Sequence, residues 1–172
     1  MNRDTTPEAT LMALSNLSAG LWRIQELLEL LTYKLEVQQV LIEAGRSRWM
    51  GRSTREIDLV LQEMREAELM RAVDAGPVCD ALGLPADTPL SEIAKAAPPP
   101  WDQVLDEHRA SLTMATSELS TLSRSNSEML EISYRAVQEA LDRFNHTPEV
   151  STYTARGARD TRRVHHLFDQ TT

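Results

Sequence analysis

The sequence predicts an all-α protein, an elongated antiparallel helical bundle or coiled coil of two long helices plus a medium and a short helix, with a disordered C-terminal tail. Leucine-rich heptad spacing over residues 7–44 and again over residues 101–144 predicts the two long helices. Few aromatic side chains are available, so the core is built from aliphatic residues, which favours helices over a β-sandwich. At 172 residues the chain suits one domain, placed at residues 1–146, with a flexible, mildly basic tail at 147–172.

The first long helix is expected from Pro7 to about Ala44, because Pro suits the first helical position and Gly45 then stops the helix. At this length it spans about 55 Å. Further leucines and valines widen its apolar face beyond a single seam, which predicts more than one neighbouring helix. The seam itself consists of Leu14, Leu17, Leu21, Ile24, Leu28, Leu31, Leu35, Gln38 and Ile42.

A corner follows at residues 45–52, and its arginines allow two interpretations. They could form a binding patch, or they could simply face water near the negative end of the first helix, which is the commoner arrangement. The arginines are Arg46, Arg48, Arg52 and Arg55. Next, Ser53-Thr54-Arg55-Glu56 fits a capping box that predicts the start of the second helix. Gly76-Pro77 predicts a break or kink in that helix.

Thr88-Pro89-Leu90 predicts the start of a short helix that ends near Ala97, with Thr88 as the N-cap and Pro89 at the first helical position. Pro98–Pro100 then form a stiff link into the last helix. From residue 111 to residue 127, nine of seventeen residues are Ser or Thr, so this stretch needs stability from packing. The inward seam of the last helix comprises Trp101, Leu105, His108, Leu112, Ala115, Leu119, Leu122, Asn126 and Met129.

Asn126 lies on this apolar seam and has two readings. It could be a buried polar residue that sets the register of helix packing at a cost in stability, or it could be partly exposed to solvent at the edge of the seam. After Asn126 the seam continues through small residues, and a bulkier column opens one residue along. We expect this second column to bind another chain, because a helix that packs only within its own protein rarely needs it. Its residues are Leu130, Tyr134, Val137, Leu141 and Phe144.

No residue pattern predicts catalysis, a cofactor or a metal. The net charge of −8 argues against a nucleic-acid surface, and neither a P-loop nor a GxGxxG motif is present. Cys79 has no basic neighbour in sequence to activate it, and a single cysteine suits a reducing compartment. His165 and His166 are adjacent and so lack the helical spacing that aims two imidazoles at one ion. Without an apolar run of about 18 residues, we expect no membrane insertion and a cytoplasmic location.

Several short motifs, taken in order, resemble the FlgN-type flagellar export chaperones of actinobacteria. The resemblance covers nearly the whole chain and begins with the leucine-rich first helix. It continues through Arg48-Trp49-Met50, Leu82-Gly83-Leu84-Pro85, Pro100-Trp101, Asn126-Ser127-Glu128-Met129-Leu130 and Thr152-Tyr153-Thr154-Ala155-Arg156-Gly157. The last of these is similar to the family's Tyr-x-x-x-Gly tail signature.

The resemblance implies a cytosolic chaperone that needs no ATP. Such chaperones bind the C-terminal helices of hook–filament junction proteins of the FlgK and FlgL types, prevent their premature assembly and deliver them to the export gate protein FlhA. The family's client contacts correspond to the column Leu130–Phe144. The tail tyrosine used at the export gate corresponds to Tyr153, although Thr154 stands where family members often have Gly.

Two alternatives stay open at the level of sequence. In one, the protein is a helical scaffold or adaptor whose second column serves homodimerisation, which could also occur in a client-free chaperone. In the other, Trp49-Met50-Gly51 is the turn of a WXG100-like secreted helical hairpin. Such hairpins have about 100 residues, whereas this chain continues through another long helix.

Overall fold

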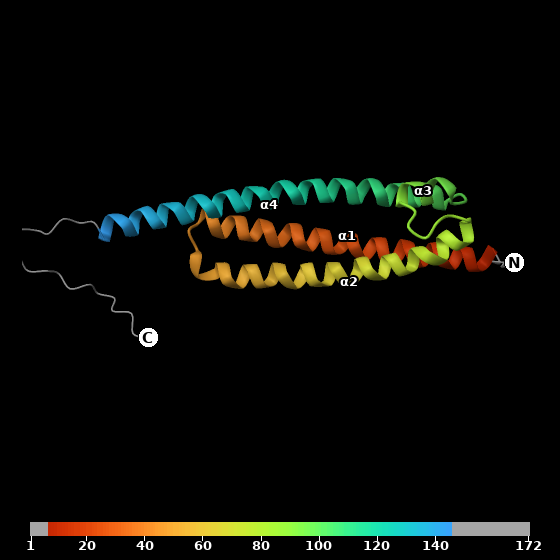
Figure 1. The fold of residues 1–172 in the computed structure, drawn as a ribbon, viewed down its shortest axis with the longest axis horizontal. Coiled ribbons are helices and arrows are strands. Elements are labelled where there is room, and N and C mark those ends of the chain that lie inside the picture. The colour runs from red at the N-terminus through yellow and green to blue at the C-terminus, as the bar shows by residue number, and fades with distance from the viewer. Residues whose placement is uncertain (1–6, 146–172) are drawn as a thin grey trace, which may run out of the picture. The chain divides into compact units, whose positions relative to one another are not determined.

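A computed structural model describes the backbone of residues 7–145 and the side chains of residues 7–143. Within this part of the chain, four α-helices and one short 3₁₀ turn account for the regular structure, which confirms the predicted all-α class. The helices are α1 (Pro7–Glu43), α2 (Met50–Leu82), α3 (Leu90–Ala96) and α4 (Trp101–Asn145), and the 3₁₀ turn η1 is Ser47–Trp49 (Figure 1).

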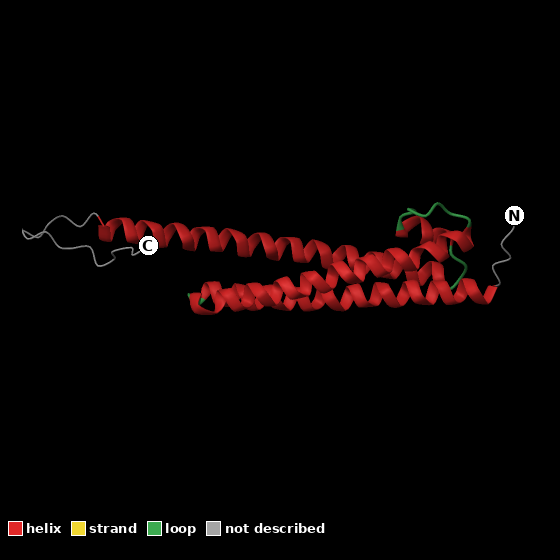
Figure 2. Cartoon of the chain, turned by 60° about the horizontal axis from the view of Figure 1, so that its bottom comes forward, coloured by secondary structure: helices red, strands yellow, loops and turns green. Residues whose placement is uncertain are grey.

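The long helices α1 and α2 form an antiparallel hairpin and lie side by side in both views (Figures 1 and 2). Leu27, Leu31 and Leu35 of α1 pack with Ile57 and Val60 of α2, and all five are buried. Ion pairs also link the two helices outside this core. Arg23 Nη2 lies 2.8 Å from Glu63 Oε2, and Lys34 Nζ lies 2.7 Å from Glu56 Oε2. The hairpin is therefore closed by apolar packing, with charged contacts at its edge.

The first part of α4 also packs against α1. Leu105 is fully buried in a cluster with Leu14, Leu17 and Leu21 of α1, and Trp101 and Leu112 pack at the edge of this cluster. The cluster continues into the C-terminal end of α2 and into α3, through Ala75, Val78, Cys79, Ile93 and Ala94. As the breadth of its apolar face predicts, α1 has more than one neighbour.

Two glycines end the long helices α1 and α2 in the same way. Gly45 has φ +62° and Gly83 has φ +70°, in the left-handed region that side chains disfavour. After each glycine the next amide bonds back to the last turn, Arg46 N to Leu41 O at 2.8 Å and Leu84 N to Cys79 O at 2.8 Å. This is the Schellman arrangement, which supplies donors for carbonyls left free at a helix C-terminus.

The predicted capping box at residues 53–56 is wrong. α2 begins three residues earlier, at Met50, directly after the 3₁₀ turn. Ser53 is buried inside the helix, and the Glu56 carboxylate binds Lys34 and Arg52 instead of a backbone amide. The sequence pattern fitted the local rule, but α2 is already helical before Ser53, and this buried residue is therefore in the helix interior.

Of the break or kink predicted at Gly76-Pro77, the break is wrong, because α2 continues through Pro77 to Leu82, and the kink stays a prediction. A proline leaves the carbonyl four residues earlier without its amide donor. Val73 and Pro77 are both exposed, so water can reach the carbonyl of Val73. The short helix is present where expected, but the hydroxyl of Thr88 bonds to Pro85 O at 2.7 Å and does not cap it.

The described residues divide into two compact units within α4. The first ends at Leu130 and contains α1, α2, α3 and most of α4, and the second begins at Glu131 and contains the end of α4. The predicted boundary at residue 146 lies at the edge of the described part of the chain and stays a prediction.

Candidate interaction surface on the last helix

The inward seam of α4 is covered as far as residue 130. Leu105 and His108 are buried, and Leu119 and Leu122 pack at the edge of the cluster formed by α1 and α2. This is the packing that the heptad spacing predicts for a helix with one internal neighbour. The face of α4 that bears this seam therefore serves the protein's own core over this stretch.

A bulky apolar column on α4 is exposed. Leu130 ends the first unit and is 38% exposed, while Tyr134, Val137 and Leu141 of the second unit are 65%, 56% and 50% exposed. At 100° per residue, these positions follow one another along one face of the helix. We call them, with Phe144, the apolar column. The side chain of Phe144 lies outside the described residues.

Small side chains border the apolar column in the second unit. Ser133, Ala136 and Ala140 continue the line of the inward seam, and all three are exposed. A bulky column beside a small one forms a step along the helix, into which the large side chains of another helix can pack. Ile132, which is 66% exposed, lies roughly on the opposite face, about 200° around the helix from Leu130.

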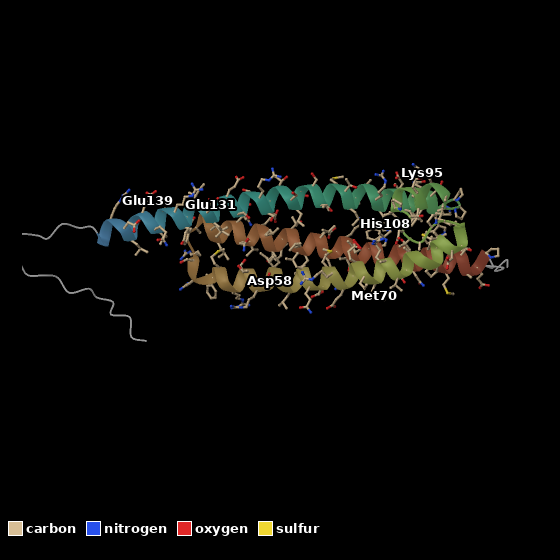
Figure 3. The ribbon with its side chains drawn as sticks, in the orientation of Figure 1. Asp58, Met70, Lys95, His108, Glu131 and Glu139 are labelled. Carbon is tan, nitrogen blue, oxygen red and sulfur yellow. The ribbon has the colours of Figure 1, made fainter. Side chains whose placement is uncertain are left out.

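Charged side chains on this stretch pair with one another within the helix. Arg135 binds Glu131 and Arg143 binds Glu139, each one helical turn apart, and Figure 3 labels both glutamates. Such exposed pairs contribute only a few tenths of a kcal/mol to helix stability. Since none of these four residues belongs to the apolar column, the column itself has no charge that a partner would have to desolvate.

α4 carries exposed hydroxyl groups closer to its N-terminus. Each hydroxyl donates to the carbonyl four residues earlier in the same helix. These bonds run from Thr113 to Arg109 O at 2.8 Å, from Thr116 to Leu112 O at 2.7 Å and from Ser127 to Ser123 O at 3.0 Å. Their donors are thus satisfied without a partner. The Ser/Thr-rich stretch therefore exposes hydroxyl groups that already have partners within α4, whereas the column that begins at Leu130 exposes bulky apolar side chains.

His108, which Figure 3 labels, forms a buried polar cluster with residues of α1 that sequence analysis missed. Its Nε2 lies 2.9 Å from Ser18 Oγ, its Nδ1 lies 3.1 Å from Gln25 Oε1, and the ring of Trp22 meets it edge-on. These distances fit a neutral imidazole that donates from Nδ1 to Gln25 and accepts at Nε2 from Ser18. Burial lowers the pKa of His108, which favours this neutral form.

The Ser18–His108–Gln25 chain has the order of a nucleophile, a base and an orienting group. However, Ser18 is 8% exposed and His108 is 4% exposed, so a substrate has no access to the hydroxyl. In addition, Gln25 is a neutral amide, and a carboxylate is the group that stabilises a charged imidazole during catalysis. The cluster joins α1 to α4 and has no geometry for acyl transfer.

Asn126 is 2% exposed, which excludes a partly solvent-exposed position at the edge of the seam. Its amide Nδ2 donates to Leu35 O at 2.8 Å and lies 3.3 Å from Gln38 Oε1, so it ties α4 to the last turns of α1. Its Oδ1 is buried without a hydrogen-bond partner. The position fits a residue that sets register, and that role stays a prediction.

In the described part of the chain, the cysteine and the potential metal ligands do not form a catalytic or metal-binding site. Cys79 is a fully buried thiol whose pKa burial raises, which disfavours the reactive thiolate. Within residues 7–143, no group of three or more His, Cys, Asp or Glu side chains is placed to hold a metal ion. None of the described helices combines the length and apolar character needed to cross a membrane. Tyr153, His165 and His166 lie outside the described residues.

Comparison with known proteins gives one match. The family model described as FlgN protein matches residues 12–161, which is most of the chain and includes α1 from residue 12 onward and the whole of α2, α3 and α4. No curated protein and no solved structure matches the chain significantly. The matched range runs from α1 through the apolar column and past Tyr153, so it far exceeds a single helical hairpin.

Proposed function

We propose, from the premise that this chain belongs to the FlgN protein family and is a flagellar export chaperone, that it holds its clients on the apolar column of α4. The clients proposed are hook–filament junction proteins of the FlgK and FlgL types, bound through their C-terminal helices before assembly. The observation that carries this proposal is the exposure of Leu130, Tyr134, Val137 and Leu141 on one face of a helix.

A client's amphipathic helix would lay its apolar face along this column, in the manner of helix-in-groove recognition. Burying four or five such side chains contributes roughly 1.5–3 kcal/mol each before the costs of ordering and association. A net affinity near micromolar or better is therefore reasonable. The neighbouring small residues are Ser133, Ala136 and Ala140. Because they occupy little space, large side chains of the client helix can pack over them, and the two helices can approach closely.

Delivery to the export gate protein FlhA is proposed for the tail, with Tyr153 as the docking residue. This assignment rests on the match of the tail to the family signature and on the family model reaching residue 161. Because the chaperone acts on clients before export, we place it in the cytoplasm. The division of labour is then simple: the apolar column holds the client, and the tail contacts the gate.

The experiment that tests the client site is the double substitution Leu130→Asp with Leu141→Asp, measured by calorimetry against a C-terminal helix of a junction protein. We expect client affinity to fall by at least about 100-fold, since two buried leucines are lost, while thermal unfolding stays nearly unchanged. Ile132→Asp is the matched control, because it adds a charge to the opposite face and should leave binding intact. Equal loss in both variants, or unfolding of the double variant, contradicts the assignment.

Tyr153→Ala separates the two halves of the proposal. It should leave client affinity unchanged and reduce secretion of junction proteins in cells. Loss of client binding in this variant would contradict the division of labour. Light scattering of the client-free protein tests the competing use of the apolar column for homodimerisation, because a dimer that the double aspartate substitution dissolves would assign the column to a second copy.

A further inference from the structure

The corner between α1 and α2 is a positive region on an otherwise acidic protein. The sequence has a net charge of −8, yet residues 44–55 carry four arginines and no acidic residue. All four arginine side chains are exposed. We call this region, with the apolar residues described next, the arginine corner: Arg46, Arg48, Arg52, Arg55, Trp49, Val37, Val40 and Leu41.

A cleft with apolar walls opens at this corner. Val37, Leu41 and Trp49 line it together with Lys34, Arg52, Ser53 and Glu56. Trp49 is 43% exposed and Val40, beside the cleft, is 62% exposed. A tryptophan on the surface beside exposed valines is the kind of residue that anchors protein interfaces.

The charges at the corner differ in how they are engaged. Arg52 and Lys34 share the carboxylate of Glu56, and these two hydrogen-bonded cations lower the pKa of Glu56 to about 2. Arg48 lies over the ring of Trp49, 5.2 Å from its centre. By contrast, Arg46 and Arg55 have no ion pair within the described part of the chain. The corner therefore has guanidinium groups available beside an apolar cleft.

We propose that the arginine corner binds an acidic segment of another protein that carries one aromatic or long aliphatic anchor residue. Carboxylates of the segment would pair with Arg46, Arg48 and Arg55, and the anchor would enter the cleft beside Trp49. Charge complementarity selects this partner, because Arg pairs well with carboxylates at interfaces. The inference goes beyond client holding, since α4 contributes no residue to the corner.

Other occupants fit the corner less well. An anionic membrane would meet the exposed Glu36 and Glu43 of α1 as well as the arginines, and a cleft suits one side chain better than a flat surface. A symmetric contact with a second copy would bring the same arginines together. The chain's own tail, residues 145–172, has four arginines against three acidic residues and so does not complement the corner.

The test measures binding of three fluorescein-labelled synthetic peptides to the full chain by anisotropy. One peptide is glutamate-rich with a central phenylalanine, the second has alanine in place of phenylalanine, and the third has lysines in place of glutamates. We expect the first to bind and the others to bind at least about tenfold more weakly, which corresponds to the loss of one anchor or of several ion pairs.

Two variants locate the binding. Arg46→Glu with Arg48→Glu alters exposed side chains only, so the fold is retained, and it should weaken the first peptide roughly tenfold or more. Arg65→Glu changes an exposed arginine of α2 outside the corner and should leave binding unchanged, as should the double aspartate substitution in the apolar column. The last result also keeps this test separate from the proposed client site.

In Trp49→Ala, the peptide with phenylalanine and the peptide with alanine should bind with similar affinity. This remaining binding should still weaken as the salt concentration rises, because it depends on ion pairs. The proposal is overturned if no acidic peptide binds at millimolar concentration, if Arg65→Glu weakens binding as much as the corner variant, or if the alanine peptide binds equally well. A membrane role would overturn it if vesicles of phosphatidylglycerol and phosphatidylcholine bind the protein but not the variant Arg46→Glu with Arg48→Glu, while the peptides do not bind. Self-association would overturn it if light scattering shows that the protein is a dimer and that this variant is a monomer.

Discussion

α1 is packed by α2 and by α4 in different ways. The contact with α2 combines buried aliphatic side chains with exposed ion pairs such as Arg23–Glu63. The contact with α4 has Leu105 at one end but depends further along on two buried polar groups, His108 and Asn126. Apolar packing tolerates small shifts, whereas buried hydrogen bonds need defined partners. The buried hydrogen bonds of His108 and Asn126 therefore hold α4, the helix that carries the apolar column, at specific positions along α1.

The largest effect is expected at the apolar end of the α1–α4 contact. Leu105→Ala removes a fully buried side chain and should lower the free energy of unfolding by about 2–5 kcal/mol. Leu141→Ala, on the same helix but 50% exposed, should change it by less than about 0.5 kcal/mol. Urea denaturation of both variants measures the difference. Similar losses at the two positions would mean that the apolar column is core.

The next effect is expected at Asn126. Asn126→Ala removes the bond to Leu35 O and leaves a small cavity, so it should cost about 1–3 kcal/mol in urea denaturation. Both substitutions remove the buried, unpartnered Oδ1, but Asn126→Leu should be less costly or stabilising, because leucine fills the space that alanine leaves empty. If Asn126→Leu is instead the more damaging substitution, the side chain contributes more than its visible hydrogen bonds.

Acid should weaken the two contacts of α1 in different pH windows. The pKa of His108 is lowered from 6.5 in the folded protein. As the pH falls, His108 is therefore protonated in the unfolded chain before it is protonated in the folded chain, and stability falls as the pH drops below about 6.5. The pKa of Glu56 is lowered from 4.5 to about 2, so its contribution is lost only as the pH falls from 4.5 toward 2.

Thermal unfolding between pH 7.5 and pH 2 measures these two windows. His108→Gln should flatten the upper part of the profile and leave the lower part unchanged, and Glu56→Gln should do the reverse. An upper part that keeps its slope in His108→Gln would show that another group titrates there.

The smallest effect is expected in the α1–α2 contact. A Cβ at Gly20 would lie 3.6 Å from Asp74 Oδ2 and 3.8 Å from the Cα of Arg71, which is ordinary contact distance. Gly20→Ala should therefore stabilise the protein by up to about 1 kcal/mol, from the higher helix propensity of alanine. A rise in the melting temperature checks this, and a fall would mean that α1 and α2 cannot accommodate the added methyl group.

Sequence periodicity predicted the long helices well, because burial on one face repeats over many turns. The end of α1 was found to within a residue, since Gly45 must adopt a positive φ there. The start of α2 was missed, and local pattern did not decide whether Gly76-Pro77 breaks the helix, because both depend on the surroundings of Ser53 and Val73 in the folded protein.

The candidate site was predictable in a similar way. The apolar column follows from helical spacing alone, and so its residues could be named before the structure. The contacts of His108 with Ser18 and Gln25 could not, because they join residues about 90 positions apart and no short-range pattern encodes the pairing. The arginine corner was visible as a cluster of charges, but the cleft beside Trp49 depends on how α1 and α2 meet.

The hydroxyl groups of α4 have a consequence for local opening. The carbonyls of Arg109, Leu112, Ser117 and Ser123 each accept a side-chain hydroxyl in addition to the amide of the helix. An acceptor shared between two donors holds each of them less strongly, and such side chains favour slight bending. Amide protons between residues 113 and 127 should therefore exchange with deuterated solvent sooner than those of the leucine-rich middle of α1, although both stretches are helical throughout.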